Sequence, residues 1–325
     1  MESREVVAIN NDLKIIKYGN RYKTVLYVYG FLAVIFIVFS IFFPLFRSPR
    51  NLSNIFIQIS PLAIIAIGQT IALIGGGVDL SVGAVVSLTT VIAANMMGAS
   101  AFGIIGWVVI ILIGAAFIGL VNGVICNETN IPPLIVTLET SSIIQGLNLW
   151  YKMAPGGDVP KGLSSVLMNK FGVLSTPIII VIILYLIFTF TMSRSSFGVH
   201  VYAIGGNEIF ARMAGVNVKR VRIGTYMISA VLAATAGLII ASRIGSGVPN
   251  VGNPYMMDSL TAVIVGGTTF AGGQGFVLGS LAGAVIISVI SNALNISGVS
   301  PFYQYIAKGA ILLIAMIINS RRKKV

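Results

Sequence analysis

Four ionisable side chains stand out in this sequence, two as isolated carboxylates in apolar sequence and two as a close pair in a polar break. Asp79 lies in GGGVDLSVG and Glu139 in VTLETSSIIQG, both within strongly apolar surroundings. Glu208 and Arg212 lie four residues apart in the more polar stretch YAIGGNEIFARMAG, residues 202–215. A carboxylate within apolar sequence can titrate or hydrogen-bond a hydroxylated solute, and an i, i+4 Glu–Arg pair supports a helix. The isolated carboxylates therefore indicate a candidate solute pathway, and the Glu–Arg pair indicates a short helix that can contact another protein.

The residues needed for enzymatic chemistry are scarce. The one cysteine, Cys126, excludes an internal disulfide and a metal cluster built from thiols. A lone histidine, His200, is more typical of a solvated side chain than of a catalyst, because catalysis needs a positioned nucleophile and base. The ATP-binding motif GxxxxGK[ST] does not occur in the sequence. We therefore expect no catalytic residue, no metal and no cofactor bound by this chain.

Composition places the chain in a lipid bilayer. Of its 325 residues, 56% are hydrophobic and 9% are charged, and the mean hydropathy is +0.97. A helix needs about 20 apolar residues to cross the hydrocarbon, so the two longest charge-free runs each hold two crossings. Glycines four residues apart, Gly119 with Gly123 and Gly279 with Gly283, predict close helix packing. The predicted fold class is an all-α polytopic membrane protein.

The predicted architecture is a single transmembrane domain over residues 25–320 with about ten helices. A cytoplasmic segment, residues 1–24, precedes it, and a basic cytoplasmic tail, residues 321–325, follows it. The first apolar run comes after basic residues and has no cleavage site behind it, so we expect it to be retained as a helix. The crossings are expected near residues 25–46, 55–74, 82–97, 102–126, 132–149, 177–192, 221–243, 257–270, 276–293 and 302–319.

The distribution of Lys and Arg predicts the orientation in the cell membrane. These residues concentrate before the first helix, in the loop 193–220 and in the C-terminal tail, which assigns all three to the cytoplasm. Both termini are then cytoplasmic, and the net charge of +12 needs no nucleic-acid partner. The loop 150–176 faces outward, where it either covers the surface or docks a partner. Its apolar residues predict a short surface helix: Leu163, Val166, Leu167 and Phe171.

A second short helix is predicted within the loop 193–220. Asn207 is a favourable N-cap residue, and Gly215 lies where a left-handed residue ends a helix. The helix carries an exposed apolar stripe, which is costly in water unless a partner covers it. We expect either a protein socket or an amphipathic helix lying on the membrane interface. The stripe consists of Ile209, Phe210 and Met213.

Asp79 lies at the junction of the second and third predicted helices. The glycines before it permit backbone geometry closed to other residues, and Asp79 or Ser81 can cap the helix that follows. Two interpretations stay open: a helix cap that tethers the junction, or a part of the solute pathway or its gate. A proton-coupling carboxylate would instead indicate a secondary transporter.

Further polar residues are candidates for the solute pathway. Glu139 either lines the passage, where it would hydrogen-bond a hydroxylated solute, or takes part in helix packing paired with Lys308 or another cation. Thr268 and Thr269 supply hydroxyl groups in a glycine-rich stretch that favours a bent or close-packed helix junction. The complete set of pathway candidates is Asp79, Ser81, Glu139, Thr268 and Thr269.

Three segments resemble the membrane subunit of ribose-type ABC sugar importers, the permeases that include those for ribose, xylose, galactose and autoinducer-2. They are GGGVDLSVGAVVSL (75–88), YAIGGNEIFARMAGVNV (202–218) and AVIVGGTTFAGGQGFVLGSLAGAVI (262–286). The resemblance covers most of the chain. In that family the helix in the cytoplasmic loop is the coupling helix, which binds in a groove of the ATPase. The matching positions are Asn207, Glu208, Ala211, Arg212 and Gly215.

The resemblance implies uptake of a monosaccharide-like solute by a dimer of this subunit, or by this subunit with a close relative. It implies an extracytoplasmic binding protein and a separate cytoplasmic ABC ATPase that holds ATP with magnesium. The expected ATPase-coupling residues are Asn207, Glu208, Ile209, Phe210, Ala211, Arg212, Met213 and Gly215.

The identity of the solute stays open. The chain departs from the family pattern at Glu139 and Gln145, where relatives carry a glycine and then an arginine. Within the ABC class, the alternatives are an importer for a nucleoside, a branched-chain amino acid or another small polar solute. An ion-coupled secondary transporter would need a titrating group within the membrane, and a channel or receptor would need no ATPase.

Overall fold

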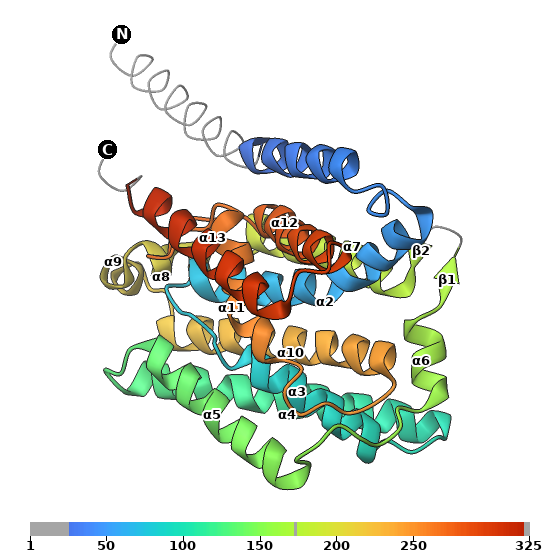
Figure 1. The fold of residues 1–325 in the computed structure, drawn as a ribbon. Helices are drawn as coiled ribbons and strands as arrows, with labels where there is room; N and C mark the ends of the chain where they lie inside the picture. The colour runs from blue at the N-terminus through green and yellow to red at the C-terminus, as the bar shows by residue number, and fades with distance from the viewer. Residues whose placement is uncertain (1–25, 172–173, 322–325) are drawn as a thin grey trace.

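The computed structural model describes residues 26–171 and 174–321. The predicted cytoplasmic segment 1–24 lies outside these residues, as does the basic tail apart from Arg321. Within the described part, the chain is almost entirely helical, and the two strands are the antiparallel pair β1 (Lys170–Phe171) and β2 (Leu174–Ser175). The all-α prediction is therefore confirmed (Figure 1).

Every predicted crossing falls on a helix of the structure. Five of them, α2, α4, α7, α10 and α12, are long and apolar enough to cross a membrane. The helices are Leu26–Phe42, α2 (Pro49–Ile74), α3 (Val82–Asn95), α4 (Ala101–Glu128), α5 (Pro133–Tyr151), α6 (Lys161–Leu167), α7 (Thr176–Arg194), α8 (Ser196–Gly206), α9 (Glu208–Met213), α10 (Val218–Ile244), α11 (Asn253–Val265), α12 (Val277–Ile296) and α13 (Pro301–Arg321).

The helices run roughly side by side, and the two ends of the bundle differ (Figure 1). One end carries α8 and α9, and the other carries α6 with the β1–β2 hairpin. Both α6 and α9 lie where the sequence predicts short helices outside the membrane, but α6 ends at Leu167, so Phe171, predicted on that helix, lies in β1. The helix α8 was not predicted, and it fills most of the stretch between α7 and α9.

The central helix of the bundle is α2. Residues 59–75 are buried without interruption, on every side of the helix. A helix that is apolar all round is typical of such a central position. It packs against α7, α10, α11 and α12, and Gly68 allows the backbone of α10 to approach closely at Ser229. The other spans are therefore arranged around α2.

The predicted glycine contacts are present. Gly119 and Gly123 of α4 lie against α10, where an added Cβ would come within 2.6 Å of the Cα atoms of Met227 and Ile223. Gly279 and Gly283 of α12 lie against the C-terminal end of α11 in the same way. Small residues at such positions let helix backbones approach closely in a membrane.

Two short helices, α3 and α11, begin beside each other inside the bundle. The stretch 246–252 runs along α3, with Thr90 Oγ1 bonded to Val248 N at 3.2 Å and Gly252 N bonded to Ser87 Oγ at 2.9 Å. With its 13 residues, α11 spans only about 20 Å, less than the hydrocarbon thickness. Non-helical backbone at membrane depth is tolerated where protein buries it or where it lines a cavity.

Candidate functional site

The loop helix α9 begins and ends as the sequence predicts. The Asn207 side chain accepts a hydrogen bond from the Phe210 backbone N at 3.1 Å, which is an N-cap. Gly215 has a φ of 83°, in the left-handed region that glycine adopts without strain. These caps satisfy backbone groups at both ends of a helix that has only six residues.

Glu208 joins α9 to the start of α10. Its Oε1 accepts from Arg212 Nη2 at 2.9 Å, as the i, i+4 spacing predicts, and its Oε2 accepts from Arg222 Nη2 at 2.5 Å. The Arg222 side chain is 17% exposed, whereas that of Arg212 is 68% exposed. The hydrogen bond and charge of Arg222, followed by those of Arg212, lower the pKa of the Glu208 carboxyl. The less exposed contact, to α10, is therefore the stronger anchor.

Arg222 also reaches α4. Its Nη1 donates to Asn127 Oδ1 at 3.2 Å, and Asn127 Nδ2 donates to the carbonyl of Gly123 at 2.7 Å. Glu208, Arg222 and Asn127 thus connect α9 to two of the five long spans. Arg222 is not among the residues predicted for this site, because a pairing 14 residues apart has no local spacing signal.

The apolar stripe of α9 faces away from the bundle. Ile209, Phe210 and Met213 are 71%, 68% and 78% exposed, whereas Ala211 is buried. The helix therefore rests on its small residue and presents its large apolar ones. Exposed apolar side chains of this kind are typical of a surface that is covered by another protein or by the membrane interface.

The helix α8 ties α9 to the core of the bundle. Val201 and Ile204 are buried, and Tyr202 OH donates to the carbonyl of Gly275 at 2.8 Å. Next to Gly205, the backbone N of Gly273 donates to the carbonyl of Ile74, the last residue of α2, at 2.8 Å. The end of α2, the glycine-rich stretch 266–275 and α8 therefore form one packed layer beside α9.

Asp79 organises the junction between α2 and α3. It is fully buried, and its Oδ1 accepts from Ser81 N at 3.0 Å and from Ser81 Oγ at 2.5 Å. Ser81 Oγ in turn accepts from Asn122 Nδ2 of α4 at 3.0 Å. Thr137 of α5 bonds backbone groups on both sides of Asp79. The junction is thus tethered by α4 and α5. The predicted helix cap is wrong, because the N-cap residue of α3 is Ser81 and, among the described residues, no side chain makes a capping hydrogen bond there.

The other pathway candidates occupy different surroundings. Ser81 and Thr268 are fully buried like Asp79, and Thr269 is partly buried. Glu139 is exposed on the outer face of α5. The structure therefore brings Asp79 and Ser81 together and leaves Glu139 and the two threonines apart from them.

The suggested pairing of Glu139 with Lys308 is wrong. Lys308 Nζ of α13 pairs with Asp258 Oδ2 of α11 at 2.7 Å, and both side chains are largely buried. Among the described residues, Glu139 takes part in no ion pair. The correct partner of Lys308 lies 50 residues earlier in a helix whose orientation the sequence does not reveal.

The polar side of α5 holds the stretch before α11. Gln145 Nε2 donates to Pro249 O at 3.1 Å and to Asn250 Oδ1 at 2.6 Å. Asn148 Nδ2 donates to Pro249 O at 2.8 Å. Ser142 is exposed on this helix, as Glu139 is. The amides of α5 therefore hold the non-helical segment, whereas its exposed hydroxyl and carboxylate groups, Ser142 and Glu139, make no contact with that segment that the structure shows.

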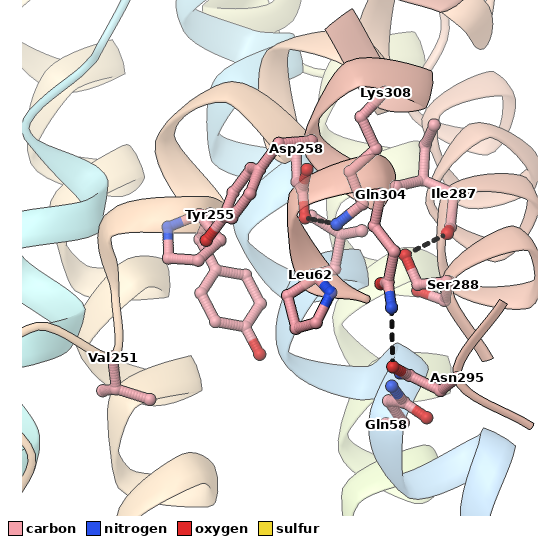
Figure 2. Close-up of a pocket in the computed structure, with 14 residues that line it drawn as sticks. Gln58, Leu62, Val251, Tyr255, Asp258, Ile287, Ser288, Asn295, Gln304 and Lys308 are labelled. Carbon is pink, nitrogen blue, oxygen red and sulfur yellow. Dashed lines mark hydrogen bonds and ion pairs between the residues drawn. The ribbon is translucent and has the colours of Figure 1, made fainter. Parts of the chain in front are cut away.

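A cavity of about 280 Å³ lies between α2, α11, α12 and α13 (Figure 2). Asp258 and Lys308 form part of its wall, and Gln304 Nε2 donates to Asn295 Oδ1 at 2.8 Å on the same side. Tyr255 and Leu62 add aromatic and aliphatic surface. This cavity could not be predicted from local sequence, since most of its lining residues come from four helices that are distant in the chain. In the described part of the chain, no three His, Cys, Asp or Glu side chains are grouped to hold a metal ion.

Comparisons with known proteins agree with the helical architecture. The family model described as "Branched-chain amino acid transport system / permease component" matches residues 51–316. The ribose import permease protein of Escherichia coli (strain K12) is 34% identical over 299 residues, 90% of this chain and 92% of the relative. The ribose import permease protein of Bacillus subtilis (strain 168) is 34% identical over 297 residues, 90% of this chain and 91% of the relative.

A third relative is a galactose/methyl galactoside import permease protein, from Haemophilus influenzae (strain ATCC 51907 / DSM 11121 / KW20 / Rd). It is 39% identical over 297 residues, 85% of this chain and 88% of the relative. No solved structure matches the chain. The family match covers nine of the ten predicted crossings almost completely, and the relatives align over nearly their whole length. This multi-pass membrane protein therefore belongs to the family of transport-system permease components.

Proposed function

We propose that this chain is the permease subunit of an ABC importer that moves a monosaccharide-like solute into the cell. The observation that carries the proposal is α9, a doubly capped helix that exposes three large apolar side chains and is anchored to α10 through Glu208 and Arg222. The sugar import permeases among the relatives support the solute class.

In this proposal, α8 and α9 lie on the cytoplasmic side, and α6 with the β1–β2 hairpin lies outside. The excess of Lys and Arg in the loop 193–220 and at both termini supports this orientation in the cell membrane. The outer end then receives the solute from an extracytoplasmic binding protein. The cytoplasmic end binds a separate ABC ATPase, which holds ATP and magnesium, and this chain binds no cofactor.

The coupling step is a movement transmitted through α9. The stripe of Ile209, Phe210 and Met213 binds the ATPase, and Asn207 and Gly215 keep the helix rigid through its caps. Glu208 passes a displacement to Arg222 at the start of α10, with Arg212 supporting Glu208 and Ala211 resting on the bundle. A packed helix responds to such a displacement as a rigid body.

The solute pathway runs along the polar face of α5. An exposed carboxylate such as Glu139 is costly against lipid and usually faces a protein partner or a water-filled cavity. A second copy of the chain, or a close relative, covers this face and completes the path. Asp79 and Ser81 tether the α2–α3 junction behind it, and Thr268 and Thr269 belong to the packed layer next to α8.

A reconstituted importer tests the proposal. The permease, its ATPase and its binding protein are placed in proteoliposomes, and uptake of radiolabelled D-ribose and D-galactose is measured with and without ATP. The proposal requires ATP-dependent uptake that disappears when the ATPase is omitted. Uptake driven by an ion gradient without the ATPase would instead establish a secondary transporter.

A branched-chain amino acid is the second candidate solute, because the description of the matching family names that class. Leucine and a nucleoside therefore serve as competing solutes in the same assay. The hydroxyl, amide and carboxylate groups along α5 favour a hydroxylated solute, since an aliphatic side chain would leave such groups unpaired. Stronger inhibition by leucine than by either sugar would change the assignment.

A further inference from the structure

We infer that the cavity between α2, α11, α12 and α13 is a binding site, within the membrane, for a neutral polyhydroxylated solute. The inference rests on the proposed function, uptake of a monosaccharide-like solute, and it adds a specific location and specific side chains. Figure 2 shows the cavity with Asp258 and Lys308 in contact on one side and Tyr255 on another.

The charge of the cavity selects a neutral ligand. Asp258 and Lys308 neutralise each other across 2.7 Å, and both side chains are largely buried. Removing one partner of such a pair leaves an uncompensated charge, which is strongly destabilising. An anionic solute would compete with Asp258 for Lys308, and a cation would compete with Lys308 for Asp258. A neutral solute can bind while the ion pair stays intact.

The pair still has hydrogen-bonding capacity for hydroxyl groups. An ammonium has three N–H donors and a carboxylate has two oxygens, and the ion pair uses one donor and one oxygen. Ser288 and the amide of Gln58 also line the cavity. The remaining polar lining residues are Ser291, Asn295, Gln304 and Tyr305. Sugar hydroxyls both donate and accept, which matches this mixture.

Apolar surface completes the match to a sugar ring. Leu62, Tyr255 and Ile287 line the cavity among the polar groups. Ligand sites are mostly apolar and aromatic, with a few polar groups that fix orientation. The volume of about 280 Å³ lies just below the range for ligand sites, about 300–1,000 Å³, so the cavity suits only a small solute.

The position of the cavity connects it to the proposed pathway. Val251 lines the cavity, and its neighbours Pro249 and Asn250 are held by Gln145 and Asn148 of α5. One short stretch of non-helical chain therefore separates the cavity from the polar face of α5. A solute that moves along α5 needs only a displacement of this stretch to reach the cavity.

Cysteine protection tests the site directly. Cys126 is the one cysteine in the chain, so Cys126→Ser provides a background without thiols. Ser291→Cys places a thiol in the cavity wall, and Ser297→Cys places a control thiol on an exposed surface beyond the end of α12. The complete importer in nanodiscs is labelled with a water-soluble maleimide, with and without D-ribose or D-galactose. We expect the transported sugar to slow labelling at 291 at least threefold and to leave labelling at 297 unchanged.

Transport kinetics provide the second measurement. Ser288→Ala removes a cavity hydroxyl that makes no hydrogen bond to the described part of the protein, so the variant should fold. We expect its KM for the sugar to rise at least threefold while kcat changes less than twofold. Ser280→Ala on the same helix lies outside the cavity and should leave KM unchanged.

The outcomes separate this inference from the proposed function. If wild-type importer transports sugar but shows neither protection at 291 nor a KM change in Ser288→Ala, the cavity is not a solute site and the importer assignment stands. Protection by glycerophosphoethanolamine and not by sugar would make it a lipid-headgroup site and overturn the inference. If wild-type importer transports no sugar, the proposed function fails, and protection at 291 still reports on the cavity independently.

Discussion

Arg222 Nη2 lies 2.5 Å from Glu208 Oε2, which joins the first residue of α9 to the first turns of α10. The same guanidinium contacts Asn127 at the end of α4. Of the two arginines that contact Glu208, Arg222 is the one shielded from solvent. A force on α9 therefore has a direct route to two membrane spans.

The first prediction concerns this route. Arg222→Gln should leave the permease folded and its ATPase bound, but should lower the number of solute molecules transported per ATP about fivefold, because a contact of about 1 kcal/mol is lost. Uptake and ATP hydrolysis are measured on the same proteoliposomes. Arg212→Gln, which changes an exposed i, i+4 pair, should have a much smaller effect. Equal effects of both variants would contradict the assigned route.

The second prediction concerns the exposed stripe. Phe210→Asp should leave the permease inserted and monodisperse, because the side chain touches little of the bundle, but should abolish capture of the ATPase. Loss of a central aromatic contact costs at least about 2 kcal/mol, a factor of about 30 in affinity. Co-purification in mild detergent measures how much ATPase each variant captures, and Phe210→Leu, which keeps an apolar side chain, is the control. Normal capture by Phe210→Asp would indicate that the stripe lies on the membrane interface.

The third prediction is a pH dependence of α9. The folded-state pKa of Glu208 is lowered by Arg222 and Arg212, so the stabilisation is complete above the ordinary glutamate pKa of about 4.3 and is lost as pH falls through the lower folded-state value. Spin labels on α9 and α10 should show a constant distance from pH 7 to pH 5 and a distribution that broadens only as the pH falls below the ordinary glutamate pKa of about 4.3. Glu208→Gln should show the broad distribution at every pH.

The fourth prediction concerns helix packing. Gly123→Ala places a Cβ within 2.6 Å of the Ile223 Cα, so α4 and α10 must separate. We expect the melting temperature of the detergent-purified permease to fall by several degrees. Gly114→Ala on the same helix meets open space, so the better helix propensity of alanine, up to about 1 kcal/mol, should keep or raise stability. Equal melting temperatures would show that the close approach is not required.

The fifth prediction separates a tether from a proton carrier at Asp79. An asparagine Oδ1 can accept the same hydrogen bonds from Ser81, so Asp79→Asn should keep ATP-driven uptake within about threefold of wild type. Asp79→Ala leaves those donors unpaired and should destabilise the permease by about 1–3 kcal/mol. Complete loss of uptake in a stable Asp79→Asn variant would indicate that the carboxylate titrates during transport.

Much of the architecture follows from sequence alone. Long apolar runs separated by polar breaks can be satisfied only as membrane helices, because lipid offers no hydrogen bonds to exposed backbone. The ends of α9 were also predictable, since the cap at Asn207 and the left-handed Gly215 each act within a few residues. Such features depend only on residues that are close together in the sequence, so the sequence is sufficient to predict them.

Tertiary structure alone decided the contacts between distant segments. Lys308 pairs with Asp258 and not with Glu139, and Glu208 pairs with Arg222 as well as Arg212. The cavity between α2, α11, α12 and α13 is likewise formed by residues from segments far apart in the chain. Apolar runs specify that helices cross the membrane. The rotation of each helix about its axis and the helices that it contacts are set by side-chain packing between segments that lie far apart in the sequence.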